Sequence, residues 1–219
     1  DAVLVTGDIG DDLSEAAYAQ FRAALSGCGA PVFCLPGNHD APALMARMLD
    51  ADGFQYCGRT RLGAWGLLML DTHLPGSAAG RVADAELERL DAELGAMAGL
   101  PVLLALHHPA LPVGSPWLDA VGLENAAQLL EVIDRHPQVR AVVAGHVHQE
   151  FAARRGAVDY YTTPSTCAQF TPRTPRCVMD RRPPGHRWLT LHPDGSHATQ
   201  VGWLPDLVGT PRQEDEARR

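Results

Sequence analysis

The stretch Pro31-Val-Phe-Cys-Leu-Pro-Gly-Asn-His-Asp40 does most to decide the fold. Its first half, residues 31–35, is a short apolar run with the length of a buried strand. Its second half, Gly37-Asn38-His39-Asp40, is a polar loop, and the nearby Pro42 suits the first turn of a helix. The stretch therefore predicts a strand, a loop with chemically capable side chains, and a helix in succession.

The same order recurs along the chain. Further apolar runs that predict strands end directly at a polar motif: Ala2 to Thr6 at Gly7-Asp8, Val102 to Leu106 at His107-His108-Pro109, and Val139 to Ala144 at Gly145-His146-Val147-His148. Trp65 to Leu70 predicts one more strand, which ends at Asp71. Helices are expected over Glu15 to Leu25, capped by Ser14, and over Ala83 to Met97 and Asn125 to Arg135.

The last third of the chain has a different pattern. Segments around Tyr160, from Trp188 to His192 and from Ala198 to Trp203 predict antiparallel strands, with a turn at Pro193-Asp194-Gly195. Together with the earlier pattern, this order predicts an α/β domain with two packed, mostly mixed β-sheets and helices outside. We expect one domain over residues 1–209 and a disordered polar tail over 210–219.

Composition narrows the class of protein. The 219 residues carry a formal net charge of −8, which argues against binding of a nucleic-acid polymer, since such binding needs clustered Lys and Arg. No apolar run approaches the roughly 20 residues that span a bilayer, so no membrane partner is expected. The five cysteines form no CxxC pair, which favours a reducing, cytoplasmic setting. The sequence starts at Asp1 inside an expected strand, so we expect the natural N-terminus to lie upstream.

The polar motifs at the strand ends are expected to converge. In α/β sheets, sites form where loops leave the carboxyl ends of the strands. Each motif alone is more often an ordinary turn or a capped loop, but their shared placement favours a common site. Asp, Asn and His side chains together form a mixed oxygen and imidazole set, which suits Mn, Fe or Zn better than Ca or Mg.

The series GD, GNHD, H-x-P and GHxH resembles the signature motifs of the calcineurin-like metallophosphoesterases. This resemblance implies a four-layer α/β/β/α sandwich whose first strand is missing from this chain. It implies that Asp8 bridges two divalent transition-metal ions, Fe or Mn or both, and that Asn38, His107 and His146 complete the second site. His148 belongs to the first site, whose Asp-x-His ligands are absent from this chain and are expected upstream of Asp8. His39 is the implied catalytic histidine beside the metals, and Asn38 and His39 contact the substrate.

Two possible metal-ligand motifs need a further decision. Asp71-Thr72-His73 has the spelling of the missing Asp-x-His motif, but it follows GNHD instead of preceding GD, so a structural turn is the preferred interpretation. In His107-His108-Pro109 the family pattern makes His107 the ligand. Strand alternation then directs His108 elsewhere, although His108 remains the alternative ligand.

The stretch Thr163-Pro-Ser-Thr-Cys-Ala-Gln-Phe170 resembles the TPSTCxQF segment of the bacterial 3',5'-cyclic AMP phosphodiesterases within this superfamily. This resemblance implies hydrolysis of a small cyclic nucleotide, 3',5'-cyclic AMP, to 5'-AMP by a hydroxide that the dinuclear metal centre activates. His39 would protonate the departing 3' oxygen or donate a hydrogen bond to it, with Asp40 orienting His39. Gln169 and Asn125 are candidates for contacts near the substrate.

Other functions share the same motifs. A relative could act on glycerophosphodiesters or on 2',3'-cyclic nucleotides with the same metal core. The non-enzymatic alternative is a partly metallated domain that does not catalyse a reaction. The sequence leaves the oligomeric state and the metal identity open.

Overall fold

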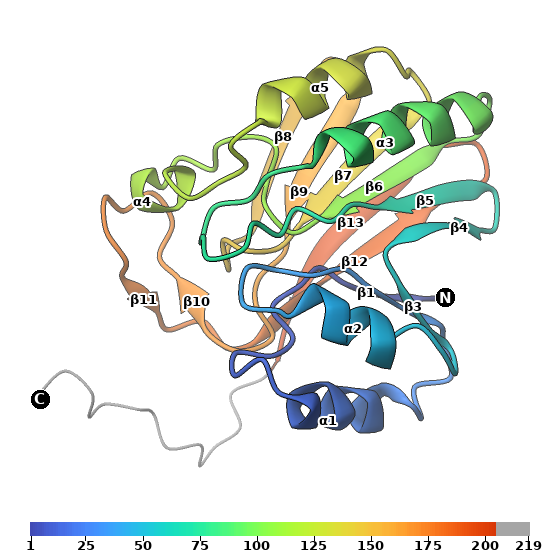
Figure 1. Ribbon diagram of the computed structural model, residues 1–219. Helices are drawn as coiled ribbons and strands as arrows, with labels where there is room; N and C mark the ends of the chain where they lie inside the picture. The colour runs from blue at the N-terminus through green and yellow to red at the C-terminus, as the bar shows by residue number, and fades with distance from the viewer. Residues whose placement is uncertain (205–219) are drawn as a thin grey trace, which may run out of the picture.

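The computed structural model describes residues 1–204 as a layered α/β protein (Figure 1). The predicted tail, residues 210–219, lies outside the described residues. The helices are α1 (Glu15–Leu25), α2 (Pro42–Met48), α3 (Asp84–Ala96), α4 (Pro116–Asp119) and α5 (Ala126–Asp134). The strands are β1 (Val3–Val5), β2 (Val32–Cys34), β3 (Phe54–Tyr56), β4 (Gly58–Leu62), β5 (Trp65–Met69), β6 (Val102–Leu106), β7 (Val139–Ala144), β8 (Phe151–Arg155), β9 (Val158–Thr162), β10 (Gln169–Phe170), β11 (Met179–Asp180), β12 (Gly185–Leu191) and β13 (His197–Trp203).

The strands form one large sheet and smaller sheets that face it. The six-stranded sheet has the order β4-β5-β6-β7-β9-β8, with parallel pairs at its centre and antiparallel pairs at both edges. The parallel sheet β1-β2-β3 and the antiparallel pair β12–β13 lie on one side of it, as Figure 1 shows. Helices α3 and α5 cover its other side, and α1 and α2 cover the far side of β1-β2-β3.

Alternation of side chains along the strands builds the core. On β6, Val102 and Leu104 pack toward α3 and α5, whereas Leu103 and Ala105 pack toward the smaller sheets. Because successive strand residues point to opposite faces, an unbroken apolar run fills both faces of a sheet that is covered on each side. The predicted arrangement of two packed sheets flanked by helices is therefore confirmed, in four layers.

Local sequence signals determine where the first two helices begin. The hydroxyl of Ser14 accepts a hydrogen bond of 3.1 Å from the backbone N–H of Ala17, which caps α1 as expected. Helix α2 begins at Pro42, where the missing N–H costs nothing because the first turn has no acceptor for it. Both helices pack on β1-β2-β3 through Tyr18, Met45 and Leu49.

Some elements differ from the expectation. The segment around Tyr160 forms β9, which is antiparallel to β8 as expected but also parallel to β7. The short strands β3, β4, β8, β10 and β11 and the helix α4 were not predicted individually. None of the helices within residues 1–204 combines the length and apolar character that a membrane crossing requires.

Candidate metal centre

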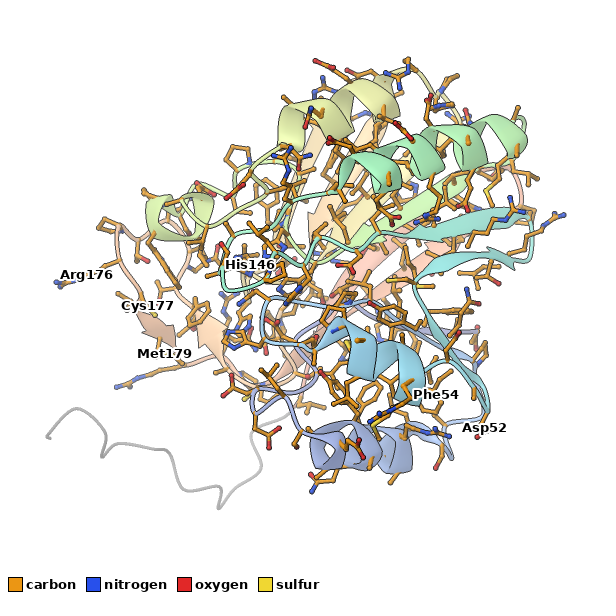
Figure 2. All side chains as sticks on the ribbon, in the orientation of Figure 1. Asp52, Phe54, His146, Arg176, Cys177 and Met179 are labelled. Carbon is orange, nitrogen blue, oxygen red and sulfur yellow. The ribbon has the colours of Figure 1, made fainter. Side chains whose placement is uncertain are left out.

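The carboxyl ends of four strands meet at one edge of the packed sheets. Asp8 follows β1, Asn38 follows β2, His107 follows β6, and His146 follows β7. The parallel pairing of β1 with β2 and of β6 with β7 brings each pair of loops to the same sheet edge. Figure 2 shows His146 inside the molecule, between the layers, on the side from which the β10–β11 hairpin projects.

Glycines allow these loops to approach one another. A Cβ atom on Gly37 would lie 2.1 Å from Oδ1 of Asp8, and one on Gly7 would lie 2.6 Å from Nδ1 of His107. A Cβ atom on Gly145 would lie 2.7 Å from the backbone oxygen of Thr6. The glycines of these three motifs therefore permit close contacts that a side chain at the same positions would block.

Four polar side chains converge at this edge. Oδ1 of Asn38 lies 3.1 Å from Nε2 of His107 and 3.0 Å from Nδ1 of His146. Oδ2 of Asp8 lies 3.3 Å from the same Nε2 of His107. The structure thus brings together four of the five residues that the sequence predicts as metal ligands.

The hydrogen bonding of His107 indicates what this cluster is suited to hold. Nδ1 of His107 lies 2.7 Å from the backbone oxygen of Thr6, which can only accept, so Nδ1 carries the hydrogen. In a neutral imidazole of this tautomer, Nε2 presents a lone pair toward the oxygens of Asn38 and Asp8. Facing lone pairs repel one another unless a cation lies between them. The donor set therefore fits a divalent metal, and the Thr6 carbonyl orients the His107 ring as metal-bound histidines usually require.

Backbone conformation is strained at three of the predicted ligands. Asp8, His146 and His148 have φ angles of 57°, 65° and 49°, in the left-handed region that side chains rarely adopt. Such conformations cost about 1–3 kcal/mol each and persist where surrounding contacts impose them. Among residues 1–204, three of the seven non-glycine residues with positive φ are thus predicted ligands.

Burial and neighbouring charges set the protonation of the cluster. Burial raises the pKa of Asp8, but a hydrogen bond and charge attraction from His107 in its cationic form, with a hydrogen on both ring nitrogens, outweigh this effect and hold the pKa well below its usual range. A metal ion between the two groups would stabilise the Asp8 carboxylate in the same way. Burial lowers the pKa of His146 to about 3. Near neutral pH the cluster thus holds a carboxylate and a neutral imidazole, the forms that coordinate metals.

His108 is grouped with His107 and His146 by distance, because ligand atoms of the three lie within 4.8 Å of one another. Its hydrogen bonds argue against a ligand role. Nδ1 of His108 lies 2.8 Å from the Thr72 hydroxyl, and Nε2 lies 3.2 Å from the backbone oxygen of Ala78. With both ring nitrogens engaged, His108 has no lone pair free for a metal. The hydrogen bonds outweigh the proximity, which favours His107 as the ligand.

The hydrogen bonds of Asp71-Thr72-His73 match a structural turn. The Asp71 carboxylate accepts a 2.8 Å hydrogen bond from the His73 backbone N–H, and Thr72 contacts His108.

His148 lies beside this cluster without joining its hydrogen bonds. Its ring stacks on Phe170 at 4.6 Å with an interplanar angle of 7°. Nδ1 of His148 and Nε2 of His146 are buried and have no hydrogen-bond partner among residues 1–204. The backbone of Val121 lies near the His146 ring and that of Ala168 near the His148 ring, but neither gives these nitrogens a hydrogen bond of normal geometry.

His39 projects from the edge of the cluster into solvent. Its side chain is 54% exposed, and Nδ1 lies 2.8 Å from Oδ1 of Asp11. Its backbone N–H donates to Oδ1 of Asp8 at 3.0 Å, which ties the loop to the centre. Asp11 was not predicted from the sequence, because an exposed acidic residue in a polar loop has no distinguishing pattern.

The expectation that Asp40 orients His39 is wrong. The Asp40 carboxylate is 2% exposed and accepts hydrogen bonds from the backbone N–H groups of Asp8 at 2.7 Å and Gly37 at 2.9 Å. It also accepts from the Tyr18 hydroxyl at 3.1 Å. Asp40 therefore holds together the two loops that carry Asp8 and Asn38.

Asn125 and Gln169 do not fit the predicted substrate contacts. The Asn125 side chain exchanges hydrogen bonds with the backbone of Val82 at 2.8 and 3.0 Å. The buried Gln169 side chain bonds the backbone N–H and C=O of Ser165 at 2.9 and 2.6 Å. Both amides are occupied by the protein, so their role is to brace loops.

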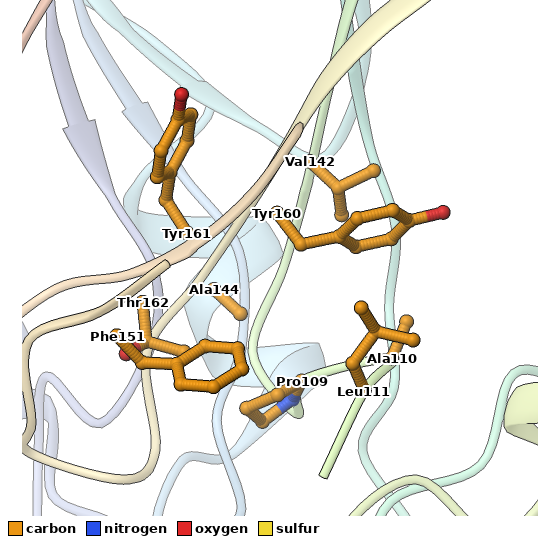
Figure 3. A pocket seen from close by; sticks show the side chains of 9 residues that line it. All are labelled: Pro109, Ala110, Leu111, Val142, Ala144, Phe151, Tyr160, Tyr161 and Thr162. Atoms are coloured by element: carbon orange, nitrogen blue, oxygen red, sulfur yellow. The ribbon is translucent and has the colours of Figure 1, made fainter. Parts of the chain in front are cut away.

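A small apolar cavity lies near Pro109, behind the loop that carries His107 and His108 (Figure 3). Its volume is about 10 Å³, and Phe151 and Tyr160 are among its lining residues. Such a space holds at most one water molecule and no nucleotide. The edge beside His39 is the candidate for the approach of a substrate, because the His39 side chain is open to solvent there.

Known proteins resemble this chain in sequence and in fold. It is 35% identical to the 3',5'-cyclic adenosine monophosphate phosphodiesterase CpdA of Pseudomonas aeruginosa, over 95% of this chain and 76% of that protein. It is 38% identical to CpdA of Escherichia coli, over 99% of this chain and 79% of that protein. The fold resembles that of a dimetal phosphatase from Danio rerio with a TM-score of 0.62, at 18% identity over 74% of this chain and 72% of that one.

Residues 1–150 match the family model of the calcineurin-like phosphoesterases, which are metal-dependent hydrolases. The matched range includes Asp8, Asn38, His107 and His146, so it covers the whole cluster. The chain belongs to the calcineurin-like phosphoesterase family.

Proposed function

We propose that this protein is a metal-dependent phosphodiesterase that hydrolyses 3',5'-cyclic AMP to 5'-AMP. The observation that carries the proposal is the convergence of Asp8, Asn38, His107 and His146 around one point, with the exposed His39 beside them. The relatives that match over most of the chain are named as phosphodiesterases of this nucleotide.

In this proposal the cluster holds a dinuclear centre of divalent transition metals, Fe or Mn or both. Asp8, Asn38, His107 and His146 would hold one ion, and Asp8 and His148 would contribute to the other. When bound, the ions supply Lewis acidity, which makes water a better nucleophile and stabilises negative charge on phosphoryl oxygens. The Thr6 carbonyl and the backbone N–H of His39 fix the orientations of His107 and Asp8 for this task.

His39 is the proposed proton donor to the leaving group. In the hydrolysis, a water oxygen bonds to phosphorus, the bond from phosphorus to the 3' oxygen breaks, and that oxygen takes up a proton. Because Nδ1 of His39 contacts Asp11, Nε2 is left to face the substrate and deliver the proton. Asp11 holds the ring in this orientation, the role that the sequence analysis had given to Asp40.

Asn38 and His39 are the proposed substrate contacts. Both lie in the loop after β2, at the exposed side of the cluster, where His39 is open to solvent. A cyclic nucleotide is a small anion, so the local positive charge of a metal centre can bind it although the protein has a net charge of −8.

Metal removal tests the proposed chemistry. Protein treated with EDTA and then freed of chelator should not hydrolyse 3',5'-cyclic AMP, and addition of Mn²⁺ should restore the release of 5'-AMP. The matched control is protein passed through the same steps without EDTA. Undiminished hydrolysis by the metal-free protein would contradict the proposal, as would absence of hydrolysis in the Mn²⁺-loaded protein.

A further inference from the structure

The segment Thr163–Phe170 contacts His148, a predicted metal ligand, with the aromatic ring of Phe170 and with its backbone. Phe170 stacks face to face on His148, with ring centroids 4.6 Å apart and an interplanar angle of 7°. The backbone N–H of Phe170 also donates to the backbone oxygen of His148 at 3.4 Å. Phe170 and His148 are thus in contact through both their side chains and their backbones.

Neighbouring contacts hold Phe170 in place. Trp117 of α4 meets the Phe170 ring edge to face, at 5.0 Å and 80°. The side chain of Gln169 bonds the backbone of Ser165 and donates to the backbone oxygen of Pro183 at 3.2 Å. Phe170 therefore presents its face to His148 from a braced position.

The residue after His148 is anchored to the same region. The Gln149 side chain exchanges hydrogen bonds with the buried Ser115 hydroxyl at 3.2 and 3.3 Å. The same hydroxyl accepts a 2.9 Å hydrogen bond from the backbone N–H of Arg173, three residues beyond Phe170. One hydroxyl thus links the loop that carries His148 to the segment that carries Phe170.

A stacked ring constrains what its partner can do. The torsion that rotates an imidazole about its bond to Cβ has broad minima, so a histidine ring turns readily unless it is packed. The lone pairs of the ring lie in its plane, and fixing that plane fixes the direction in which a nitrogen can coordinate. A flat partner 4.6 Å away fixes the plane without using either ring nitrogen.

We infer that Phe170 is a positioning residue that holds the His148 ring in the plane needed to coordinate a metal ion. The inference rests on the proposed ligand role of His148. It gives the Thr163–Phe170 segment a role in metal binding, distinct from contact with the nucleotide.

Binding of Co²⁺ to the metal-free protein tests the inference without any substrate. Phe170→Leu and Phe170→Met remove the flat face but keep an apolar side chain, and Phe170→Tyr keeps the flat face. Phe151→Leu is the matched control, because Phe151 packs in the same apolar cluster as Phe170. His148→Ala reports the ligand role itself. Affinity and visible absorption of bound Co²⁺ are measured for each variant, together with its unfolding in urea.

The expected result is a loss of about tenfold in Co²⁺ affinity for Phe170→Leu and Phe170→Met, at the lower end of the losses seen when an outer partner of a ligand is removed. Phe170→Tyr should retain the wild-type affinity and spectrum, and so should Phe151→Leu. Equal losses in Phe170→Leu and Phe151→Leu would overturn the inference, since general loosening would explain both. Unchanged binding in Phe170→Leu alongside weakened binding in His148→Ala would overturn the inference alone. Unchanged binding in His148→Ala would overturn the ligand role as well.

Discussion

Replacement of Asp40 by Asn tests whether this buried carboxylate joins the two loops that carry Asp8 and Asn38. The change keeps the shape of the side chain but replaces one acceptor oxygen with an NH₂ donor. Oδ2 accepts from the backbone N–H groups of Asp8 and Gly37, and Oδ1 accepts from that of Gly10 and from the Tyr18 hydroxyl. In either orientation the new NH₂ group faces donors, so at least two hydrogen bonds are lost.

The size of the effect follows from the number and type of these bonds. Hydrogen bonds to a charged group contribute about 1.5–3 kcal/mol each, so two of them correspond to a loss of about 3–6 kcal/mol in the free energy of unfolding. The side chain is 2% exposed, so water cannot replace the lost partners. A loss of this size is large beside the 5–15 kcal/mol that typically separates a folded domain from its unfolded state.

Urea unfolding of the metal-free protein, followed by circular dichroism, measures the change. Asp11→Asn is the matched control, because it makes the same substitution in the loop after β1, at a side chain that is 91% exposed. Asp11→Asn should change the free energy of unfolding by less than about 0.5 kcal/mol, as surface substitutions usually do. A loss below about 1 kcal/mol in Asp40→Asn, or equal losses in both variants, would refute the reasoning.

Two further predictions concern the division of roles within the cluster. His39→Ala should retain bound metal but lower turnover by about 10²–10⁴, the usual effect of losing a general acid, whereas His146→Ala should lower both metal content and turnover. Metal analysis and kinetics on the same samples distinguish the two variants. Metal loss only in His39→Ala would reverse the assignment of His39 as the proton donor and His146 as the ligand. Gly37→Ala should displace the Asp8 carboxylate, because the new Cβ would lie 2.1 Å from Oδ1, and so reduce bound metal. Gly95→Ala, where a Cβ meets nothing within 4 Å, should retain it, and equal metal content in the two glycine variants would show that the contact is unimportant.

Within the large sheet, the strands that the sequence predicted are the interior ones. Strands β5 and β6 are continuous apolar runs, and β7 is apolar apart from the exposed Arg140, because both faces pack against other layers. Edge strands were missed because their composition is mixed. In β4, Gly58–Leu62, half-buried and exposed residues alternate and two arginines break the apolar run. Segment 58–62 becomes a strand because it pairs with β5, and such a contact between segments cannot be seen in the local sequence pattern.

The residues of the candidate site also fall into a group that the sequence predicted and a group that it did not. Asp8, Asn38, His107 and His146 were predicted because each follows a recognisable strand in a short motif. The supporting residues were missed or misassigned, because their roles depend on loops that are distant in sequence. Asp40 bonds a loop about 30 residues away, and Phe170 stacks on a histidine that precedes a different strand. Such contacts leave no local pattern for a motif search to detect.

The most direct test of the proposed function is the specificity of the metal-loaded protein. The measurement is kcat/KM for 3',5'-cyclic AMP against 2',3'-cyclic AMP and a glycerophosphodiester, because discrimination between substrates is the ratio of these constants. The proposal predicts the highest value for 3',5'-cyclic AMP. Preference for either competitor by more than about tenfold, roughly 1.4 kcal/mol of transition-state stabilisation, would contradict it.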